Sequence, residues 1–191
     1  MTVQAEDKFI YRGRICSIDR GSGYGNDPDS ELFDIKQVGL NPTGESTANW
    51  RGYVATFGLE GDKLLLMELS TNNGNREKGN SESPIVKING VKPEIVEPYW
   101  DNSACPNFRY LKYREVNLPL LFTGTITIRR EPYRFESLPY SLQFIELHFE
   151  EGTLVAEKDL SEKMADKRKS KTTSAAEQFL LDFVRSQDTE Q

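Results

Sequence analysis

The chain has 191 residues and a mass of 21.8 kDa, which suffices for one sizeable hydrophobic core. Its net charge of −6 argues against a general nucleic-acid binder, because such proteins carry a basic excess that neutralises phosphates. The sequence holds no apolar run of the roughly 18–20 residues that span a bilayer, and residues 1–8 do not resemble a signal peptide. We therefore expect a cytoplasmic protein without a membrane partner.

The first third of the chain predicts one strand followed by loops. Residues 9–18 are largely apolar and predict a strand, with Gly13 as a bulge or a turn. Residues 19–29 are rich in Gly, Asp and Pro and predict a loop. A short apolar piece at 32–35 precedes a second loop through residues 41–44.

The segment 53–69 has the strongest pattern in the sequence and predicts a β-hairpin. Apolar residues occupy every second position from 53 to 60, which is typical of a strand with one buried face. The predicted inward residues are Tyr53, Ala55, Phe57 and Leu59. Gly61 and Asp62 fit a two-residue turn, and the apolar run 64–69 predicts a returning strand that is covered on both faces.

The remaining strands follow similar patterns. Residues 85–92 predict a strand or a hairpin around an Asn-Gly turn, and residues 121–130 alternate with Ile126 and Ile128 on one face. A second clear hairpin is predicted over residues 142–158. Its inward residues are Ile145, Leu147 and Phe149, and its outward residues are Glu146, His148 and Glu150.

The C-terminal part changes in composition. Residues 160–171 predict a charged linker or a frayed helix, and residues 172–187 predict an amphipathic helix that begins with a capping box at Ser174 and Glu177. Its apolar stripe consists of Ala176, Phe179, Leu180, Phe183 and Val184. We expect a mainly β protein with some α structure (α+β): one domain over residues 8–159, built on a twisted antiparallel sheet of hairpins, with the helix packed on it or on a partner.

Residues 50–57 read W-R-G-Y-V-A-T-F, and residues 62–66 read D-K-L-L-L. This pair resembles an uncharacterised bacterial family with the hairpin motif W-R-G-Y-x-A-T-[WF] followed by D-K-L-x-L. The resemblance continues more weakly at 118–128 and in the closing hairpin at 145–159. It departs at Phe57, where the family usually has Trp, and at Leu120 and Leu121. The resemblance implies a shared fold and a bacterial origin, and it carries over no activity.

Residue patterns typical of ion or phosphate binding are incomplete. The loop Gly21–Gly25 would suit a phosphate, but the helix that such a site needs does not follow it. Asp27, Asp29 and Glu31 alternate as calcium ligands do, but the glycine and the final glutamate of an EF-hand are missing. Cys16, Cys105 and the single His148 are too few for a four-ligand zinc site. We expect no metal and no cofactor.

Catalytic patterns are equally incomplete. His148 has no recognisable nucleophile motif near it, so we interpret it as a surface residue. Glu146, Glu150 and Glu151 supply carboxylates as a glycosidase does, and a charged sheet surface explains them as well. We expect no catalytic residue and favour a protein that is not an enzyme.

Aromatic residues leave two interpretations open. The segment 108–114 interleaves aromatic and basic residues and, with Arg129, Arg130 and Arg134, would suit single-stranded nucleic acid; snorkelling side chains over a half-buried strand explain it equally. Trp50 and Trp100 either line a pocket or lie in the core.

Two functions follow. The first is a non-enzymatic protein-interaction module that binds a partner or a second copy through Phe179, Leu180, Phe183 and Val184. The second is a binder of a small molecule or carbohydrate, with hydrolysis as an extension, that uses Tyr24, Trp50, Tyr99 and Trp100 beside loop carboxylates.

Overall fold

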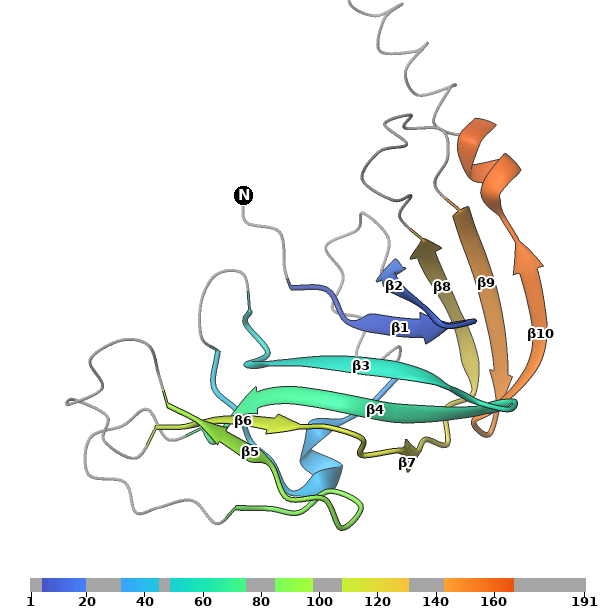
Figure 1. Cartoon of the computed structure of the whole chain (residues 1–191). Coiled ribbons are helices and arrows are strands. Elements are labelled where there is room, and N and C mark those ends of the chain that lie inside the picture. The colour runs from blue at the N-terminus through green and yellow to red at the C-terminus, as the bar shows by residue number, and fades with distance from the viewer. Residues whose placement is uncertain are drawn as a thin grey trace, which may run out of the picture.

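The computed structural model describes residues 5–19, 32–44, 49–74, 85–97, 108–130 and 143–166. These residues are mainly strand, arranged in one sheet (Figure 1). The strands are β1 (Lys8–Tyr11), β2 (Arg14–Asp19), β3 (Tyr53–Glu60), β4 (Lys63–Asn72), β5 (Glu94–Val96), β6 (Tyr110–Tyr113), β7 (Leu118–Pro119), β8 (Gly124–Arg130), β9 (Gln143–Glu150) and β10 (Thr153–Asp159). The prediction of a mainly β protein is therefore confirmed.

Seven of these strands close into a barrel in the order β10-β9-β8-β2-β1-β3-β4. The barrel closes where the tips of the two long hairpins meet, because Thr153 of β10 pairs with Lys63 of β4. Leu64 N donates to the Gly152 carbonyl at 2.8 Å, and Leu154 N donates to the Asp62 carbonyl at 2.7 Å. Figure 1 shows this meeting point at the lower right.

The prediction of an open, twisted sheet is therefore wrong, because the sheet closes into a barrel. Neighbouring strands rotate in one direction, so a sheet that continues over seven strands curls until its edges meet and pair. One pairing also breaks the antiparallel pattern, since β1 runs parallel to β3 with Phe9 beside Phe57. The other strand pairs are antiparallel, and β5, β6 and β7 extend the sheet from β4.

The central hairpin is confirmed with its predicted faces. Tyr53, Ala55 and Phe57 are buried, at 5%, 0% and 1% exposure. Gly61 occupies the turn with φ of 62°, a conformation that glycine adopts without strain. A bulge lies in the register between Thr56 and Phe57.

The other hairpins follow the predicted segments. Residues 9–18 form two strands, β1 and β2, and Gly13 (φ 71°) lies in the turn between them. β9 and β10 form the closing hairpin, with Leu147 and Phe149 buried in the core. Residues 88–91 form only a tight turn around Asn89 and Gly90, whose ends are bridged from Ile88 to Val91.

Helical structure is short in the described part of the chain. A 3-10 helix, η2 (Ile35–Val38), is capped by the Asp34 carboxylate, which accepts from Lys36 N at 2.9 Å. Residues 161–166, within the predicted linker, are helical. None of the described helices has the length and apolar content to cross a membrane. The predicted helix 172–187 lies outside the described residues.

Candidate functional site

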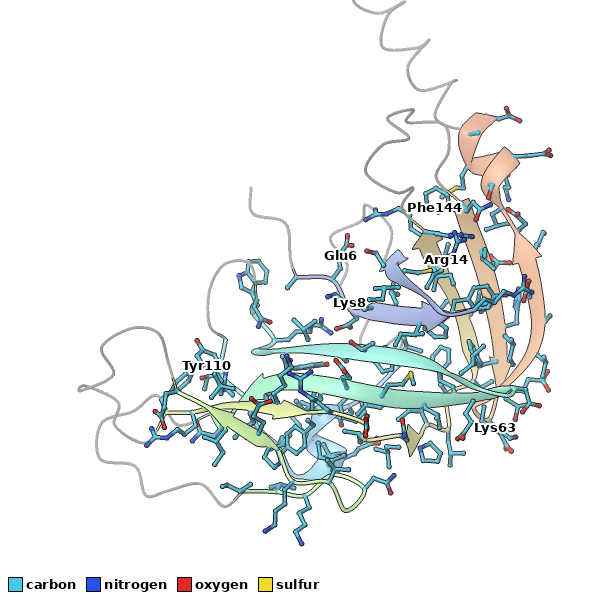
Figure 2. The ribbon with its side chains drawn as sticks, viewed as in Figure 1. Glu6, Lys8, Arg14, Lys63, Tyr110 and Phe144 are labelled. Atoms are coloured by element: carbon cyan, nitrogen blue, oxygen red, sulfur yellow. The ribbon has the colours of Figure 1, made fainter. Side chains whose placement is uncertain are left out.

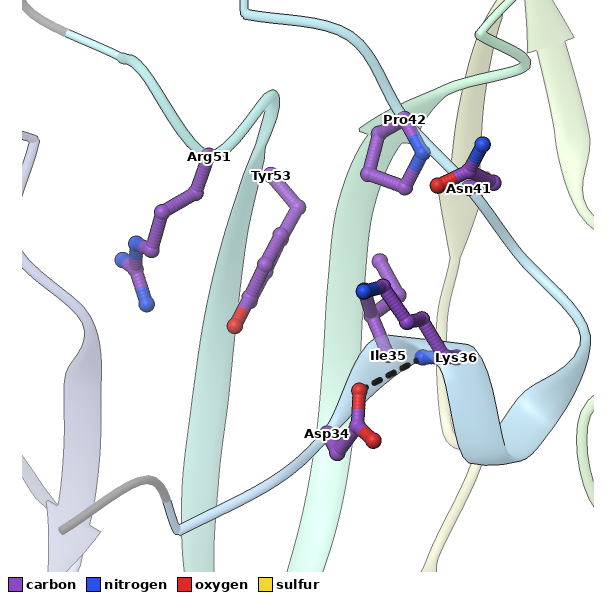
Figure 3. A pocket seen from close by; sticks show the side chains of 7 residues that line it. All are labelled: Asp34, Ile35, Lys36, Asn41, Pro42, Arg51 and Tyr53. Carbon is purple, nitrogen blue, oxygen red and sulfur yellow. Dashed lines mark hydrogen bonds between the residues drawn. The ribbon is translucent and has the colours of Figure 1, made fainter. Parts of the chain in front are cut away.

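A small pocket lies where the chain enters β3. It has a volume of about 230 Å³ and opens to solvent. Its wall combines the start of β3 with the segment around η2, as Figure 3 shows. The lining residues are Asp34, Ile35, Lys36, Asn41, Pro42, Arg51 and Tyr53.

An ion pair holds Arg51 at this corner. Its two terminal nitrogens each donate to a carboxylate oxygen of Asp7 at 2.9 Å, and Asp7 is only 1% exposed. Ala55 N donates to the same carboxylate at 2.9 Å. The guanidinium also stacks over the Tyr53 ring, 4.5 Å from its centroid. Burial lowers the pKa of Arg51, but its hydrogen bonds to Asp7 and the charge of that carboxylate outweigh burial, so the pKa is raised overall.

Backbone contacts fix the neighbouring loop. Gly52 has φ of 70°, and a Cβ at this position would lie 2.2 Å from the Thr43 carbonyl oxygen, so only glycine fits. Asn72, which is fully buried, accepts from Thr43 N at 3.0 Å and from Gly74 N at 2.8 Å. Its amide nitrogen donates to the Thr43 carbonyl at 2.8 Å. The loop that carries Asn41 and Pro42 is therefore held against β3 and β4.

The polar groups of the pocket suit binding. The side chains of Lys36 and Asn41 have no hydrogen-bond or ionic partner among the described residues. Asp34 uses one carboxylate oxygen to cap η2. Together with the Tyr53 ring, these amine, amide and carboxylate groups can orient a polar group of a ligand or of a partner protein. The lining contains no histidine, cysteine or serine that would act as a base or nucleophile.

Trp50 lies next to the pocket in sequence and is 61% exposed. Its interpretation as a core residue is therefore wrong. Its side chain is also not among those that line the described pocket, so it stands as a separate exposed aromatic. The other predicted ligand residues, Tyr24, Tyr99 and Trp100, lie outside the described residues, as do Phe179, Leu180, Phe183 and Val184.

A second polar cluster lies on the outer wall of the barrel. His148 Nδ1 is 3.0 Å from Thr125 Oγ1, and His148 Nε2 is 3.0 Å from Glu146 Oε1. This is the order of groups in a hydroxyl–imidazole–carboxylate triad. The sequence pattern does not single out Thr125, because only the register of β8 with β9 places it opposite His148.

Geometry favours a structural role for this cluster. Thr125 is exposed, and the His148 side chain keeps 39% of its surface exposed. Acyl transfer also requires oxyanion donors and a site that excludes water, and the described pocket contains none of the three residues. Cross-strand hydroxyl and charge pairs of this kind stabilise a sheet surface. Glu150 shares the face, as predicted, and is exposed.

In the segment 108–114 the aromatic and the basic side chains lie in different surroundings. Phe108, Leu111 and Tyr113 are buried, while Arg109 pairs with Glu97 and Arg114 with Glu94. The aromatic rings of the segment 108–114 therefore mostly face the core, as the snorkelling interpretation predicts.

Most residues of the predicted metal and phosphate sites lie outside the described ranges. Cys16 is buried, and no cluster of three or more potential metal ligands occurs within the described ranges. The loop Gly21–Gly25, together with Asp27, Asp29, Glu31, Cys105 and Arg134, lies outside them.

The chain was compared with protein families, with curated proteins and with solved structures. No protein-family model, no curated protein and no solved structure matches the chain. The resemblance of residues 50–66 to a bacterial family stays a prediction.

Proposed function

We propose that this chain is a non-enzymatic protein-interaction module of the bacterial cytosol, and that the corner formed by Trp50 and Arg51, above the buried Tyr53 ring, contacts the partner. The observation that carries the proposal is the 61% exposure of Trp50 on a backbone held by buried contacts. Bacterial origin rests on the sequence resemblance, and a cytosolic location agrees with the acidic composition.

The chemistry of the corner matches that of interface hot spots. Tryptophan, tyrosine and arginine dominate such sites, because they bury a large area and also donate hydrogen bonds. Asp7 holds the Arg51 side chain, and the Asn72 amide donates to the Gly52 carbonyl, so the chain directly after Trp50 is fixed. A partner therefore has little conformational entropy to remove from this surface when it binds.

The alternative is a binder of a small molecule or carbohydrate. The side chains of Lys36 and Asn41, without partners among the described residues, favour it. The pocket is small for this purpose, because about 230 Å³ lies below the 300–1,000 Å³ typical of ligand sites. A single side chain of a partner protein fits this space better than a whole ligand, so we rank the interaction module first.

A photo-cross-linking experiment separates the two functions. The full chain would carry a photoactivatable residue at Gln37, beside the pocket, and would be irradiated in the source cell. We expect one protein partner, whose yield falls about tenfold or more with Trp50→Ala. The matched control is Leu121→Ala, which removes another exposed apolar side chain, 88% exposed, and leaves the yield unchanged.

Two results would contradict the interaction module. One is equal cross-linking by the parent and Trp50→Ala. The other is a small molecule that native mass spectrometry detects on the purified chain and that Lys36→Ala releases, which would establish the ligand-binding alternative.

A further inference from the structure

Two opposite charges line the pocket at the entry of β3 without pairing with each other. Lys36 and Asp34 both belong to its lining, but they form no ion pair, so more than 4.0 Å separates the lysine Nζ from the carboxylate oxygens. Asp34 Oδ1 accepts from Lys36 N at 2.9 Å. The Oδ2 atom of Asp34 and the amine of Lys36 have no partner among the described residues. The pocket therefore presents a positive and a negative group at separate positions.

The third charged residue of the lining is already neutralised. Both terminal nitrogens of Arg51 donate to the Asp7 carboxylate, which is buried and does not line the pocket. This pair adds no net charge, and the other two charges of the lining have opposite sign, so the pocket is neutral overall and polar. An acidic occupant would oppose Asp34 and a basic one would oppose Lys36, and opposed like charges destabilise an interface.

A primary amide matches this arrangement. Its carbonyl oxygen accepts from an ammonium group, and its NH2 group donates to a carboxylate. Because each hydrogen bond is about 2.9 Å long, an amide bridges two groups that are too far apart to pair directly. Figure 3 shows the Lys36 side chain reaching across the pocket toward Tyr53, with Asn41 and Pro42 on one side of it and Asp34 on the other. The Tyr53 ring and Pro42 supply an apolar wall for the carbon atoms of the same side chain.

We propose that the pocket binds an asparagine or glutamine side chain of the partner protein, with the amide carbonyl at Lys36 and the NH2 group at Asp34. This specificity rests on the interaction module proposed above, whose partner contacts Trp50. One side chain fits a volume of about 230 Å³. Its hydrogen bonds give selectivity and little net affinity, because water competes for the same groups. The affinity comes from the apolar area of Trp50, which is 61% exposed.

Peptide selection tests the proposed specificity. The immobilised full chain would select from a display library of short random peptides, and we expect the enriched peptides to share one asparagine or glutamine. One enriched peptide would then be synthesised in three versions, with the amide residue, with glutamate and with lysine at that position. The parent chain should bind the amide version about tenfold or more tightly than either charged version, because each charged version leaves one group of the pocket unsatisfied.

Two variants of the chain should change this order. Asp34→Asn removes the negative charge and keeps a side chain that caps η2, so it should bind the glutamate version about tenfold more tightly than the parent does. Lys36→Met removes the amine and should favour the lysine version in the same way. The matched control is Lys8→Met, which removes an exposed lysine of β1 outside the lining (Figure 2) and should keep the order of the parent. Circular dichroism establishes that each variant is folded.

Two outcomes would overturn the proposal. One is a selection that enriches no peptide or enriches peptides without a shared amide residue. The other is an order of binding that neither Asp34→Asn nor Lys36→Met changes. The interaction module fails separately: a Trp50-dependent cross-link without any preference for amides overturns the specificity alone, whereas an amide preference without a cross-linked partner overturns the module and supports the chemistry of the pocket.

Discussion

The residues of the W-R-G-Y motif have four different tasks in the structure. Trp50 is exposed, Arg51 neutralises the buried Asp7, Gly52 permits the close approach of Thr43, and Tyr53 packs in the core. The Asp7 carboxylate is enclosed and accepts hydrogen bonds from Arg51 and from Ala55 N, and Arg51 supplies its counter-charge. The ion pair links the chain just before β1 to the entry of β3.

Arg51→Ala tests this dependence. The substitution leaves a carboxylate that is 1% exposed without its counter-charge, and breaking a buried pair typically costs about 3–5 kcal/mol. For a chain of this size we expect the melting temperature to fall by roughly 6–20 °C.

The matched control is Arg12→Ala, which removes an ion pair to Glu157 whose side chains are 73% and 35% exposed. Exposed pairs contribute about 0–1 kcal/mol, so the control should melt within a few degrees of the parent. Equal melting of both variants, measured by calorimetry, would contradict a special role for Arg51.

Among the elements, hairpins were predictable from sequence because their cause is local. Alternation over residues 53–60 specifies which side chains face inward, and Gly61 permits the turn. The same holds for β9 and β10, where the turn at Gly152 also has positive φ. Residues 32–38 were harder to predict, since a 3-10 turn capped by Asp34 has no distinctive periodicity.

The predicted helix 172–187 is the element whose role an experiment can decide directly. A lone helix of this length is marginal in water, so its apolar stripe requires a surface to stabilise it. We expect truncation after Lys171 to lower the melting temperature or to increase the binding of a hydrophobic dye. Unchanged melting temperature, mass and dye binding would show that the segment does not contribute to docking. The control is Phe183→Ala in the full chain, which alters the apolar stripe without shortening the chain. It should change the melting temperature or the dye binding in the same direction as the truncation.

At the scale of the whole molecule, two tyrosines connect parts of the structure that are distant in sequence. Tyr11 donates to the Glu157 carboxylate and thereby links β1 to β10. Tyr113 donates to the Val86 carbonyl at 2.8 Å, which ties the segment 85–91 to β6. Burial raises the pKa of both hydroxyls to about 12, and the hydrogen bond to Glu157 adds to the effect at Tyr11.

These pKa values predict a loss of stability in alkali. The folded pKa of about 12 lies above the ordinary value of 10.0, so the folded state binds these protons more tightly than the unfolded state. The stabilisation is complete below pH 10 and is lost as pH rises through 12. Each tyrosine contributes at most about 1.4 kcal/mol per pH unit over this window.

Urea unfolding between pH 9 and pH 12 measures this effect. The double variant Tyr11→Phe and Tyr113→Phe should be less stable than the parent at pH 9, and its stability should fall less steeply toward pH 12. Parallel curves would show that neither tyrosine titrates with unfolding. Tyr110→Phe, with a half-buried ring at the surface of β6, is the control.

The sequence by itself determined the strands, their turns and most of the inward faces, because side-chain alternation and turn residues act over a few neighbouring positions. Only the tertiary structure decided that the sheet closes, that β1 runs parallel to β3, and that Asp7 meets Arg51. It also decided that Thr125 lies beside His148. The physical reason is that alternation states which face a residue occupies, whereas the register between strands distant in sequence depends on which edges meet when the whole sheet curls.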